Sequence, residues 1–415
     1  MKIAIVGSGI AGLTCAYLLA RRHEITVFEA DARIGGHTHT VPVTVDGREY
    51  SVDTGFIVFN DWTYPNFIRL LGQLGVTFKP TEMSFSVNDP DTGLEYNGNN
   101  LNSLFAQRSN LLSPGFWGML RDILRFNKEA RRDLAEQRIA ADTTLDDYLK
   151  AGGYGERFIL HYIVPMGAAI WSMPMAEMLN FPLQFFVRFF ENHGLLSISN
   201  RPQWQVIEGG SSAYIAPLTA SFKERIRLNC PVSRIDRDAH GVVIHSPAGI
   251  ERFDKVVLAC HSDQALRLLG NPDDKEREIL GALPYADNEV VLHTDTRLLP
   301  TRKRAWASWN YRLGGAGHTR AAVTYDMNIL QGLQSGTTFC VSLNQSAGIT
   351  PSKVLARFTY AHPQFSLAAV AAQQRWAEID GAQHTHYCGA YWANGFHEDG
   401  VVSALRVAAS FGESL

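Results

Sequence analysis

The chain has 415 residues, more than one hydrophobic core usually organises, so we expect two domains. Hydrophobic residues make up 46% and charged residues 19%, which indicates a globular protein and excludes a mainly disordered chain. The net charge of −3 gives no electrostatic reason to expect a nucleic-acid partner.

The five cysteines are scattered and form no CxxC pair, which indicates buried thiols in a reducing compartment. The N-terminus lacks the basic and apolar regions of a signal peptide, and no apolar stretch reaches the roughly 18 residues that a membrane span needs. We therefore expect a cytoplasmic protein. No feature of the sequence specifies an oligomeric state.

The first elements predicted along the chain form a βαβ unit. Residues 2–7 and 24–30 are short apolar runs typical of buried strands, and residues 10–22 carry apolar side chains at helical spacing. The helix begins at Ile10 and Ala11, and its unpaired N–H groups suit a bound phosphate.

The loop of this unit has the spacing of a dinucleotide-binding fingerprint. Gly7 permits the tight turn, Gly9 lets the backbone approach a pyrophosphate, and Gly12 lets the helix pack closely on the sheet. Glu29, at the end of the second strand, is placed to accept hydrogen bonds from an adenosine ribose. We therefore predict a bound dinucleotide.

The next stretches, "EADARIGGHTHT" at 29–40 and "VDTGFIVFN" at 52–60, identify the dinucleotide by resemblance. They resemble FAD-dependent flavoproteins of the flavin amine oxidase, protoporphyrinogen oxidase and phytoene desaturase superfamily, and most closely a bacterial branch of predicted NAD/FAD-binding proteins. The resemblance implies FAD, with the glycine pair around the diphosphate and the second stretch near the isoalloxazine ring. The residues that it assigns to the cofactor here are Ala30, Arg33, Gly35, Gly36, His37, Thr54, Gly55 and Phe56.

Three later stretches fit the same resemblance: 204–218, 228–260 and 387–411. The second implies that the Val232 backbone contacts the adenine, and the third resembles the closing FAD motif. Many relatives have a Gly-Glu pair in that motif where this chain has Gly-Ala, and acids follow later. The residues assigned to the cofactor in the closing motif are Gly389, Ala390, His397, Glu398 and Asp399. No residue suggests a covalent attachment point, so we expect non-covalent FAD.

These positions predict an α/β fold with a doubly wound, Rossmann-like FAD-binding domain and a discontinuous α+β substrate domain. The FAD-binding domain is expected to combine residues 1–80, 204–284 and 385–415. Residues 81–203 and 285–384 are left for the substrate domain.

Two stretches of the predicted substrate domain are informative. Residues 113–137 predict an amphipathic helix rich in basic side chains, which suits either a helix covering the core or peripheral contact with an anionic membrane. The apolar side of this helix is predicted to be Phe116, Trp117, Leu120, Ile123 and Leu124. Residues 180–196 contain five phenylalanines and predict a buried helix that either fills a core or lines an apolar substrate tunnel.

The histidines and the last aromatic residues are candidates for chemistry. The HxH pairs at 37–39 and 384–386 have no cysteine or acid cluster nearby, so we predict no metal site. His397 is predicted to touch flavin or substrate, although an ordinary loop histidine would look the same. Tyr391 and Trp392 suggest part of an aromatic cage and complete the candidate catalytic residues.

A single dinucleotide fold with no second GxGxxG unit argues against an NADPH-dependent enzyme. The leading hypothesis is therefore an FAD-dependent oxidoreductase that abstracts hydride from a small apolar substrate, such as a fatty-acyl or lipid chain. The alternatives are a flavin amine oxidase, a flavin-dependent isomerase without net redox, and a non-catalytic FAD-bound scaffold.

Overall fold

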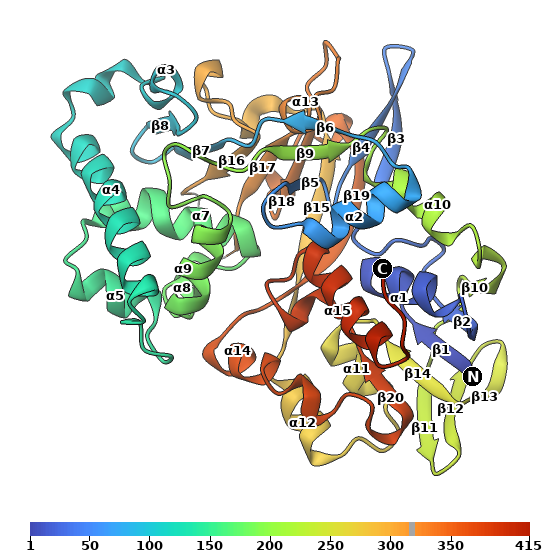
Figure 1. The fold of residues 1–415 in the computed structure, drawn as a ribbon. Helices are drawn as coiled ribbons and strands as arrows, with labels where there is room; N and C mark the ends of the chain where they lie inside the picture. The colour runs from blue at the N-terminus through green and yellow to red at the C-terminus, as the bar shows by residue number, and fades with distance from the viewer. Residues whose placement is uncertain (315–319) are drawn as a thin grey trace.

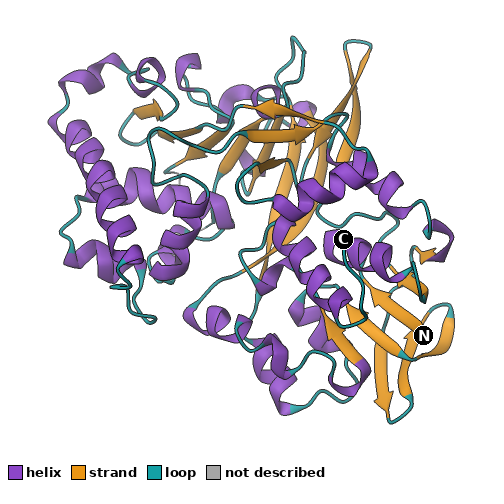
Figure 2. Cartoon of the chain, in the orientation of Figure 1, coloured by secondary structure: helices purple, strands orange, loops and turns teal. Residues whose placement is uncertain are grey.

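The computed structural model describes residues 1–314 and 320–415. Figure 1 shows the two chain termini in the same part of the molecule, beside a parallel sheet. A larger, mainly antiparallel sheet lies above it in this view, and helices of the middle of the chain gather at the left (Figure 2).

The described chain forms a parallel five-stranded sheet from segments far apart in the sequence. Its strands, in spatial order, are β10 (Ile226–Arg227), β2 (Glu24–Phe28), β1 (Lys2–Val6), β14 (Lys255–Leu258) and β20 (Thr385–Tyr387). Ile5 of the central strand is in register with Val27 on one side and with Val257 on the other. The expected doubly wound core is therefore present, because short parallel strands with the buried, mainly apolar β1, β2 and β14 at the centre pair in one sheet.

Alternate side chains of β1 point to opposite faces of this sheet. Ile3 and Ile5 pack in the cluster that contains α1 (Ile10–Leu19), α2 (Pro65–Leu74), α10 (Ile215–Thr219) and α15 (His397–Ala409). Ala4 and Val6 pack in the opposite cluster with β11 (Arg234–Asp238), β12 (Gly241–Ser246), β13 (Gly249–Phe253), α11 (Ser262–Leu268) and α12 (Asp274–Gly281). Both faces of the sheet are thus covered.

Helix α14 (Leu367–Gln373) lies on the parallel-sheet side of the molecule, although we assigned residues 285–384 to the substrate domain. Its residues Ala369 and Ala372 are buried in the same cluster as β14. The chain therefore returns to the parallel sheet before residue 384, because this alanine-rich helix has its apolar partners there.

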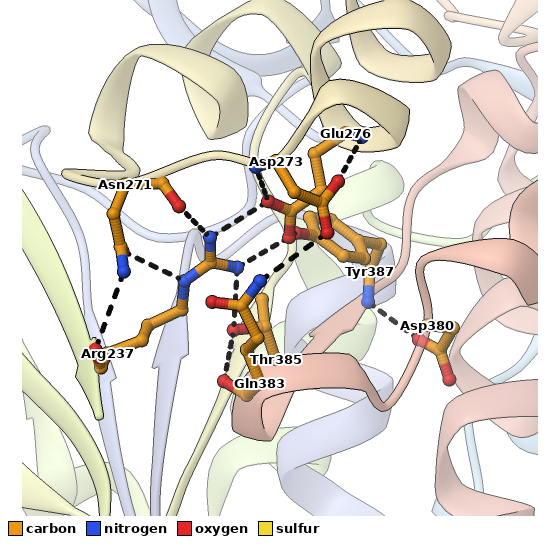
Figure 3. Close-up of polar contacts among 8 residues, drawn as sticks. All are labelled: Arg237, Asn271, Asp273, Glu276, Asp380, Gln383, Thr385 and Tyr387. Carbon is orange, nitrogen blue, oxygen red and sulfur yellow. Dashed lines mark hydrogen bonds and ion pairs between the residues drawn. The ribbon is translucent and has the colours of Figure 1, made fainter. Parts of the chain in front are cut away.

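A buried polar network ties three elements of this region together (Figure 3). Arg237 Nη2 on β11 donates to Glu276 Oε2 on α12 at 2.8 Å, and the Tyr387 hydroxyl on β20 donates to Glu276 Oε1 at 2.6 Å. The side chains of Arg237 and Glu276 are 0% and 1% exposed. Burial opposes ionisation of Glu276, but the hydrogen bonds from Arg237 and Tyr387 outweigh it and lower the pKa of this carboxyl.

The larger sheet comes from the predicted substrate segments. Its described strands, in spatial order, are β19 (Val354–Pro363), β15 (Tyr285–His293), β18 (Cys340–Leu343), β17 (Val323–Asp326), β16 (Trp309–Arg312), β7 (Phe85–Asp89) and β8 (Leu94–Asn97). Neighbours are antiparallel except β16 and β7, which are parallel. Smaller sheets pair β3 (Thr40–Val45) with β4 (Arg48–Asp53), and β9 (Trp204–Ile207) with both β5 (Val58–Asn60) and β6 (Phe78–Thr81).

Helices between β8 and β9 pack beside this sheet (Figure 2). They are α3 (Leu101–Leu104), α4 (Pro114–Ala135), α5 (Leu145–Ala151), α6 (Glu156–Phe158), α7 (Val164–Trp171), α8 (Met175–Met178) and α9 (Leu183–Asn192), and α13 (Met327–Leu330) follows β17. A π-helical segment, Ile159–Ile163, joins α6 to α7. Within the described residues, no helix combines the length and apolar character needed to cross a bilayer.

Helix α4 begins where the sequence predicts, because the Ser113 side chain accepts a hydrogen bond from the Phe116 amide. The predicted apolar side is only partly correct. Phe116 is buried, whereas Trp117 and Leu124 are 50% and 52% exposed. Leu120 and Ile123 are partly buried and pack against the core as predicted. The helix also buries Met119 and Phe126, so its packing face is rotated away from Trp117 and Leu124.

Candidate functional site

The glycine loop of the βαβ unit is sterically fixed. A Cβ added to Gly12 would lie 2.0 Å from the Gly7 carbonyl oxygen, so only glycine lets α1 pack this closely. Gly7 has a φ of +105° and would bring a Cβ to 2.8 Å from the Ala259 carbonyl oxygen. A Cβ at Gly9, in contrast, would meet nothing within 4 Å. The protein therefore leaves open space on the Gly9 side of the loop, beside the first-turn amides of Ile10 and Ala11.

Glu29 lies at the end of β2 and faces this loop. Its Oε2 accepts hydrogen bonds from the Ser8 amide at 2.9 Å and the Ser8 hydroxyl at 2.5 Å, and its Oε1 accepts one from the Asp31 amide at 2.9 Å. Since a carboxylate offers about four acceptor positions, it retains capacity for a ribose hydroxyl. Ala30 follows it directly.

A second glycine loop lies against the first. A Cβ at Gly36 would approach the Gly9 Cα to 3.1 Å, and the Gly35 amide donates to the Ser8 carbonyl at 2.9 Å. Arg33 closes this loop on itself, because its guanidinium donates to the carbonyls of Gly36 at 2.7 Å and of Thr38 at 3.2 Å. The side chain of Arg33 is thus engaged by the backbone of the loop.

The stretch around Gly55 lies beside these two glycine loops, and we call the two loops and this stretch together the cofactor cradle. A Cβ at Gly55 would lie 2.1 Å from the His37 carbonyl oxygen, and the Phe56 amide donates to the same oxygen at 2.8 Å. The Thr54 amide donates to the His39 carbonyl at 2.9 Å. These contacts hold residues 37–39 and 54–56 side by side.

His397 joins this part of the site from the first residue of α15. Its ring stacks on Phe56 with centroids 3.5 Å apart, and its Nε2 lies 2.9 Å from Thr38 Oγ1 and 3.3 Å from the Tyr214 hydroxyl. Burial lowers the pKa of His397 to about 3, so the imidazole is neutral at physiological pH. The structure thus places His397 among the predicted cofactor residues.

The sequence analysis missed the larger sheet's contribution to this region. The Tyr360 hydroxyl on β19 lies 2.8 Å from both His39 Nδ1 and Thr54 Oγ1. The His37 ring has its centroid 5.3 Å from that of His362, also on β19, and 6.3 Å from that of His261. Residues 360 and 362 share one strand face, and this alternation was the available signal.

A buried aspartate that we did not single out connects two of the quoted stretches. Asp53 accepts hydrogen bonds from the Ser211 amide and hydroxyl at 2.9 Å, and from Gln331 Nε2 at 2.8 Å. Burial raises the pKa of Asp53 to about 6, although the hydrogen bonds from Thr40 and Ser211 lower it in part. Asp53 thus fixes the stretch 52–60 against the stretch 204–218.

The closing motif differs from the prediction in its aromatic residues. Tyr391 and Trp392 are 2% and 5% exposed and pack in the core cluster on one face of the parallel sheet, behind Gly389 and Ala390. A Cβ on Gly389 would lie 2.3 Å from the Tyr391 ring. Neither aromatic residue is among those that line the two cavities described below. Both rings find more apolar contact in the core than at a cleft.

The two acids of the motif stabilise helix starts. Glu398 accepts hydrogen bonds from the backbone amides of Asn66 and Phe67, at the start of α2. Asp399 accepts one from the Phe396 amide at 2.9 Å, and burial raises the pKa of its carboxyl to about 7. These hydrogen bonds do not support the side-chain role toward FAD that was predicted for the two acids. Each acid already accepts hydrogen bonds from backbone N–H groups at the start of a helix, where those groups have no partner within the helix.

Val232 lies in the segment that joins β10 to β11. The Cys230 amide donates to the Glu29 carbonyl at 2.8 Å, which places this segment beside the end of β2. Val232 is 9% exposed. The residues assigned to the adenosine end of FAD, Glu29 and Val232, are thus brought together across about half of the chain.

An aromatic cavity adjoins the cradle and contains about 1050 Å³ of space outside protein atoms, part of it open to solvent. Val58 and Phe396 line it, and they lie close along the chain to Phe56 and His397. The other lining residues are mostly apolar or aromatic: Tyr64, Met83, Ser84, Phe85, Tyr96, Gly98, Asn99, Tyr162, Met166, Ile170, Phe189, His193, Leu195, Arg201, Trp204 and Trp309. Both readings of residues 180–196 apply in part, since Phe189 and Leu195 line the cavity while Phe186 and Phe190 fill the core.

A second, more polar pocket shares Tyr64, His193 and Phe396 with this aromatic cavity and contains about 790 Å³ of space outside protein atoms, part of it open to solvent. Glu398 and Asp399 line it. Burial lowers the pKa of His193 to about 4, so this histidine adds no positive charge to either space at neutral pH. Arg201 is therefore the charged residue among those that line the aromatic cavity.

The cradle fits an extended, anionic cofactor. Open space adjoins Gly9, and His37 Nε2 is one of the buried polar atoms that have no hydrogen-bond partner within the described residues. His37 belongs to a stretch that resembles an FAD-binding motif. Unpartnered buried groups are costly and are usually satisfied by a ligand or water.

Comparison with known families decides the class of cofactor. The profile of the family described as flavin containing amine oxidoreductase matches residues 10–322. The chain belongs to this family. Membership implies a flavin cofactor and an oxidoreductase, and the cradle described above is where the flavin dinucleotide would lie.

Individual relatives are distant. L-amino-acid oxidase of Mus musculus is 26% identical over 315 residues, which cover 70% of this chain and 47% of the relative. The chain spans about half the length of the curated relatives that it matches. A putrescine oxidase bound to putrescine has a TM-score of 0.71 with 15% identity, covering 99% of both chains. A fatty acid isomerase from P. acnes that produces CLA has a TM-score of 0.71 with 16% identity, covering 99% of this chain and 98% of the other. These structural similarities show a shared fold.

Proposed function

We propose that this member of the family is an FAD-dependent oxidoreductase that takes a hydride from an apolar, acyl-type substrate. The observation that carries the proposal is the cavity beside the cradle, whose lining is dominated by apolar and aromatic side chains. Such a lining favours a hydrocarbon chain through apolar burial. Bound FAD would supply the hydride acceptor, and the substrate would lose two hydrogens as a hydride and a proton.

The roles of this chain are to orient the substrate and exclude water. Phe396 and Val58 line the cavity and are near neighbours along the chain of the cradle residues His397 and Phe56, so we take them as the cavity wall nearest the cradle. Hydride transfer needs roughly 3 to 3.5 Å between the donor carbon and the acceptor atom, so the reacting carbon of a bound chain would lie at this end of the cavity. The neutral His397 ring keeps this wall free of positive charge.

The charge at the cavity supports a neutral or anionic substrate. Arg201 lines it, and no Asp or Glu is among its lining residues. A protonated amine would gain no ion pair there and would be repelled by the guanidinium. We therefore favour a chain that ends in a carboxylate or ester.

A flavin amine oxidase is the second candidate, and the adjoining polar pocket is the observation that favours it. Glu398 and Asp399 line that pocket, which shares Phe396 with the cavity. Both carboxylates already accept backbone hydrogen bonds, so they offer a cationic amine less than free acids would. The fatty acid isomerase with the same fold supports a third candidate, isomerisation without net redox.

Anaerobic mixing of the FAD-loaded protein with a substrate panel separates these candidates. The panel comprises long-chain fatty acids, their methyl esters, and primary amines. We expect acyl chains to bleach the visible absorbance of the flavin and amines to leave it unchanged. Bleaching by amines alone would replace the proposal with an amine oxidase. A shifted double bond without lasting bleaching would replace it with an isomerase.

A cavity variant tests where the substrate lies. Ile170→Trp should fill part of the cavity and slow flavin reduction by long chains at least about tenfold, while FAD binding stays unchanged. Ile250→Trp, at an exposed position 70% accessible on the β13 hairpin, is the matched control. Equal rates in Ile170→Trp and wild type would place the substrate outside this cavity.

We also propose that FAD is held without a covalent bond. The cysteine of the closing motif, Cys388, is fully buried, and burial together with Cys15 raises the pKa of its thiol, so it is not a reactive thiolate. Denaturation followed by centrifugation should leave the flavin in the supernatant. Flavin that remains with the precipitated protein would contradict this.

A further inference from the structure

The outer side of helix α4 exposes large apolar side chains that a helix covering the core does not need to expose. Leu112, just before the helix, is 89% exposed, and Trp117 and Leu124 on the helix are 50% and 52% exposed. The Trp117 indole N–H already donates to the Leu111 carbonyl at 2.9 Å. The only polar atom of the ring therefore has a protein partner, and the exposed part of the ring is apolar.

Basic residues occupy the same helical face. Trp117, Arg121, Leu124 and Lys128 follow one another at steps of four, three and four residues, and all four are exposed. The opposite side of α4 is the one that packs on the core, through Phe116 and other buried residues. We call Leu111, Leu112, Trp117, Arg121, Leu124 and Lys128 the α4 face.

The acids of α4 are turned away from this face. Asp122 is buried and accepts from the Gly155 amide at 2.9 Å. Glu129 accepts from the Tyr154 hydroxyl at 2.6 Å, and Asp133 from the Tyr148 hydroxyl at 2.8 Å. These acids therefore have inward hydrogen-bond partners, although Asp122 Oδ1 also lies 3.9 Å from the exposed Arg121 Nε. The α4 face carries basic side chains among apolar ones.

The α4 face is close along the chain to the aromatic cavity. Asn99 lines the cavity, and Leu101, two residues later, is 76% exposed at the start of α3, which leads toward α4. Tyr162 also lines the cavity, and Leu160, on the same π-helical segment, is 39% exposed. Exposed leucines therefore flank two of the lining segments.

We propose that the α4 face docks on the surface of an anionic lipid bilayer. Leucine and tryptophan side chains would enter the interface between headgroups and acyl chains, and Arg121 and Lys128 would contact anionic headgroups. Charge complementarity selects this partner, because a mixed apolar and basic face without outward acids matches an anionic lipid surface. This docking does not depend on which substrate the cavity binds.

Cosedimentation of the FAD-loaded protein with vesicles tests the docking. We expect little binding to phosphatidylcholine alone, strong binding when phosphatidylglycerol is added, and loss of binding at high salt. Leu112→Ser and Arg121→Glu should each weaken binding to the anionic vesicles about tenfold. In vesicles with brominated acyl chains, tryptophan fluorescence should be quenched in wild type and less so in Trp117→Phe.

Matched substitutions on the far side of the molecule are the controls. Ile250→Ser changes an apolar residue that is 70% exposed and Lys223→Glu an exposed lysine, and both should bind like wild type. Equal losses in the control variants, or no binding to anionic vesicles, would overturn the proposal. A dimer that Leu112→Ser converts to a monomer, without vesicle binding, would assign the α4 face to a second copy of the chain.

Discussion

The cofactor cradle and the aromatic cavity are adjacent, but they are built in different ways. In the cradle, backbone groups touch one another, as where a Cβ on Gly12 would lie 2.0 Å from the Gly7 carbonyl oxygen. The cavity is bounded by side chains, and several of them, such as Met166, Ile170 and Phe189, have apolar neighbours of similar size. One added methyl carbon can therefore prevent the cradle from forming, whereas the cavity walls can accept side chains of a different volume.

This difference explains how the family can share one cofactor and vary its substrates. The cradle depends on glycines and a carboxylate whose conformation or charge other residues do not provide. The lining of the cavity depends on total volume and polarity, which many combinations of residues provide. Substitutions at Gly12, Glu276, Glu29 and His397 should show how far the cradle and the sheet that carries it depend on single residues, in contrast to the cavity.

The largest effect is expected from adding one methyl group to the cradle. Gly12→Ala should abolish FAD binding and lower the yield of folded protein, because the Cβ would overlap the Gly7 carbonyl. Gly118→Ala, in the interior of α4, is the control, since a Cβ there meets nothing within 4 Å. Flavin absorbance of the purified proteins is the measurement. Full flavin content in Gly12→Ala would mean that the loop adjusts, and would remove the steric argument.

The next largest effect is a loss of stability when the buried polar network of the parallel-sheet region is broken. Glu276→Gln should destabilise the protein by about 3 to 5 kcal/mol, because it leaves the buried Arg237 without its ionic partner. Glu278→Gln, on the exposed side of the same helix, removes only a surface contact with Arg375 and should unfold like wild type. Chemical unfolding of both variants provides the comparison. Similar losses in the two variants would show that burial of this pair is unimportant.

A smaller effect is expected at the ribose position. Glu29→Ala should weaken FAD binding by about 1.5 to 3 kcal/mol, because it removes an acceptor that bonds the loop and would bond the ribose. Glu24→Ala, on the exposed start of the same strand, should bind FAD like wild type. The dissociation constant is measured by titrating apoprotein with FAD. An unchanged constant in Glu29→Ala would contradict the ribose assignment.

The last effect is a pH dependence located between the two regions, and it is absent at neutral pH. The pKa of His397 is lowered to about 3 by burial, while an unfolded histidine titrates near 6.5. Between these values the unfolded state binds more protons, so stability falls as pH drops through this window. His397 should contribute at most about 1.4 kcal/mol per pH unit.

The contribution is isolated by comparing thermal midpoints of wild type, His397→Gln and the exposed control His240→Gln between about pH 6.5 and 4. The decline on acidification should be shallower in His397→Gln than in wild type, and unchanged in His240→Gln. Parallel curves for all three proteins would show that His397 is not held neutral by the fold.

The sequence alone determined the βαβ unit, the positions of Gly7, Gly9, Gly12 and Glu29, and the class of cofactor. Each of these residues has a local geometric or electrostatic requirement that acts over a few residues, so its spacing along the chain can be read directly. The start of α4 at Ser113 was predictable for the same reason, because a capping side chain and its amide partner are three residues apart.

Only the tertiary structure decided which side chains face the cofactor, the substrate cavity and the solvent. Tyr391 and Trp392 are buried in the core. Glu398 accepts a hydrogen bond from the start of a helix more than 300 residues earlier in the chain. Tyr360 reached the cradle from the larger sheet, and the outer face of α4 kept Trp117 exposed. Each of these contacts joins residues that are far apart in the sequence and become neighbours only when the chain has folded. The spacing of residues within one segment therefore cannot predict them.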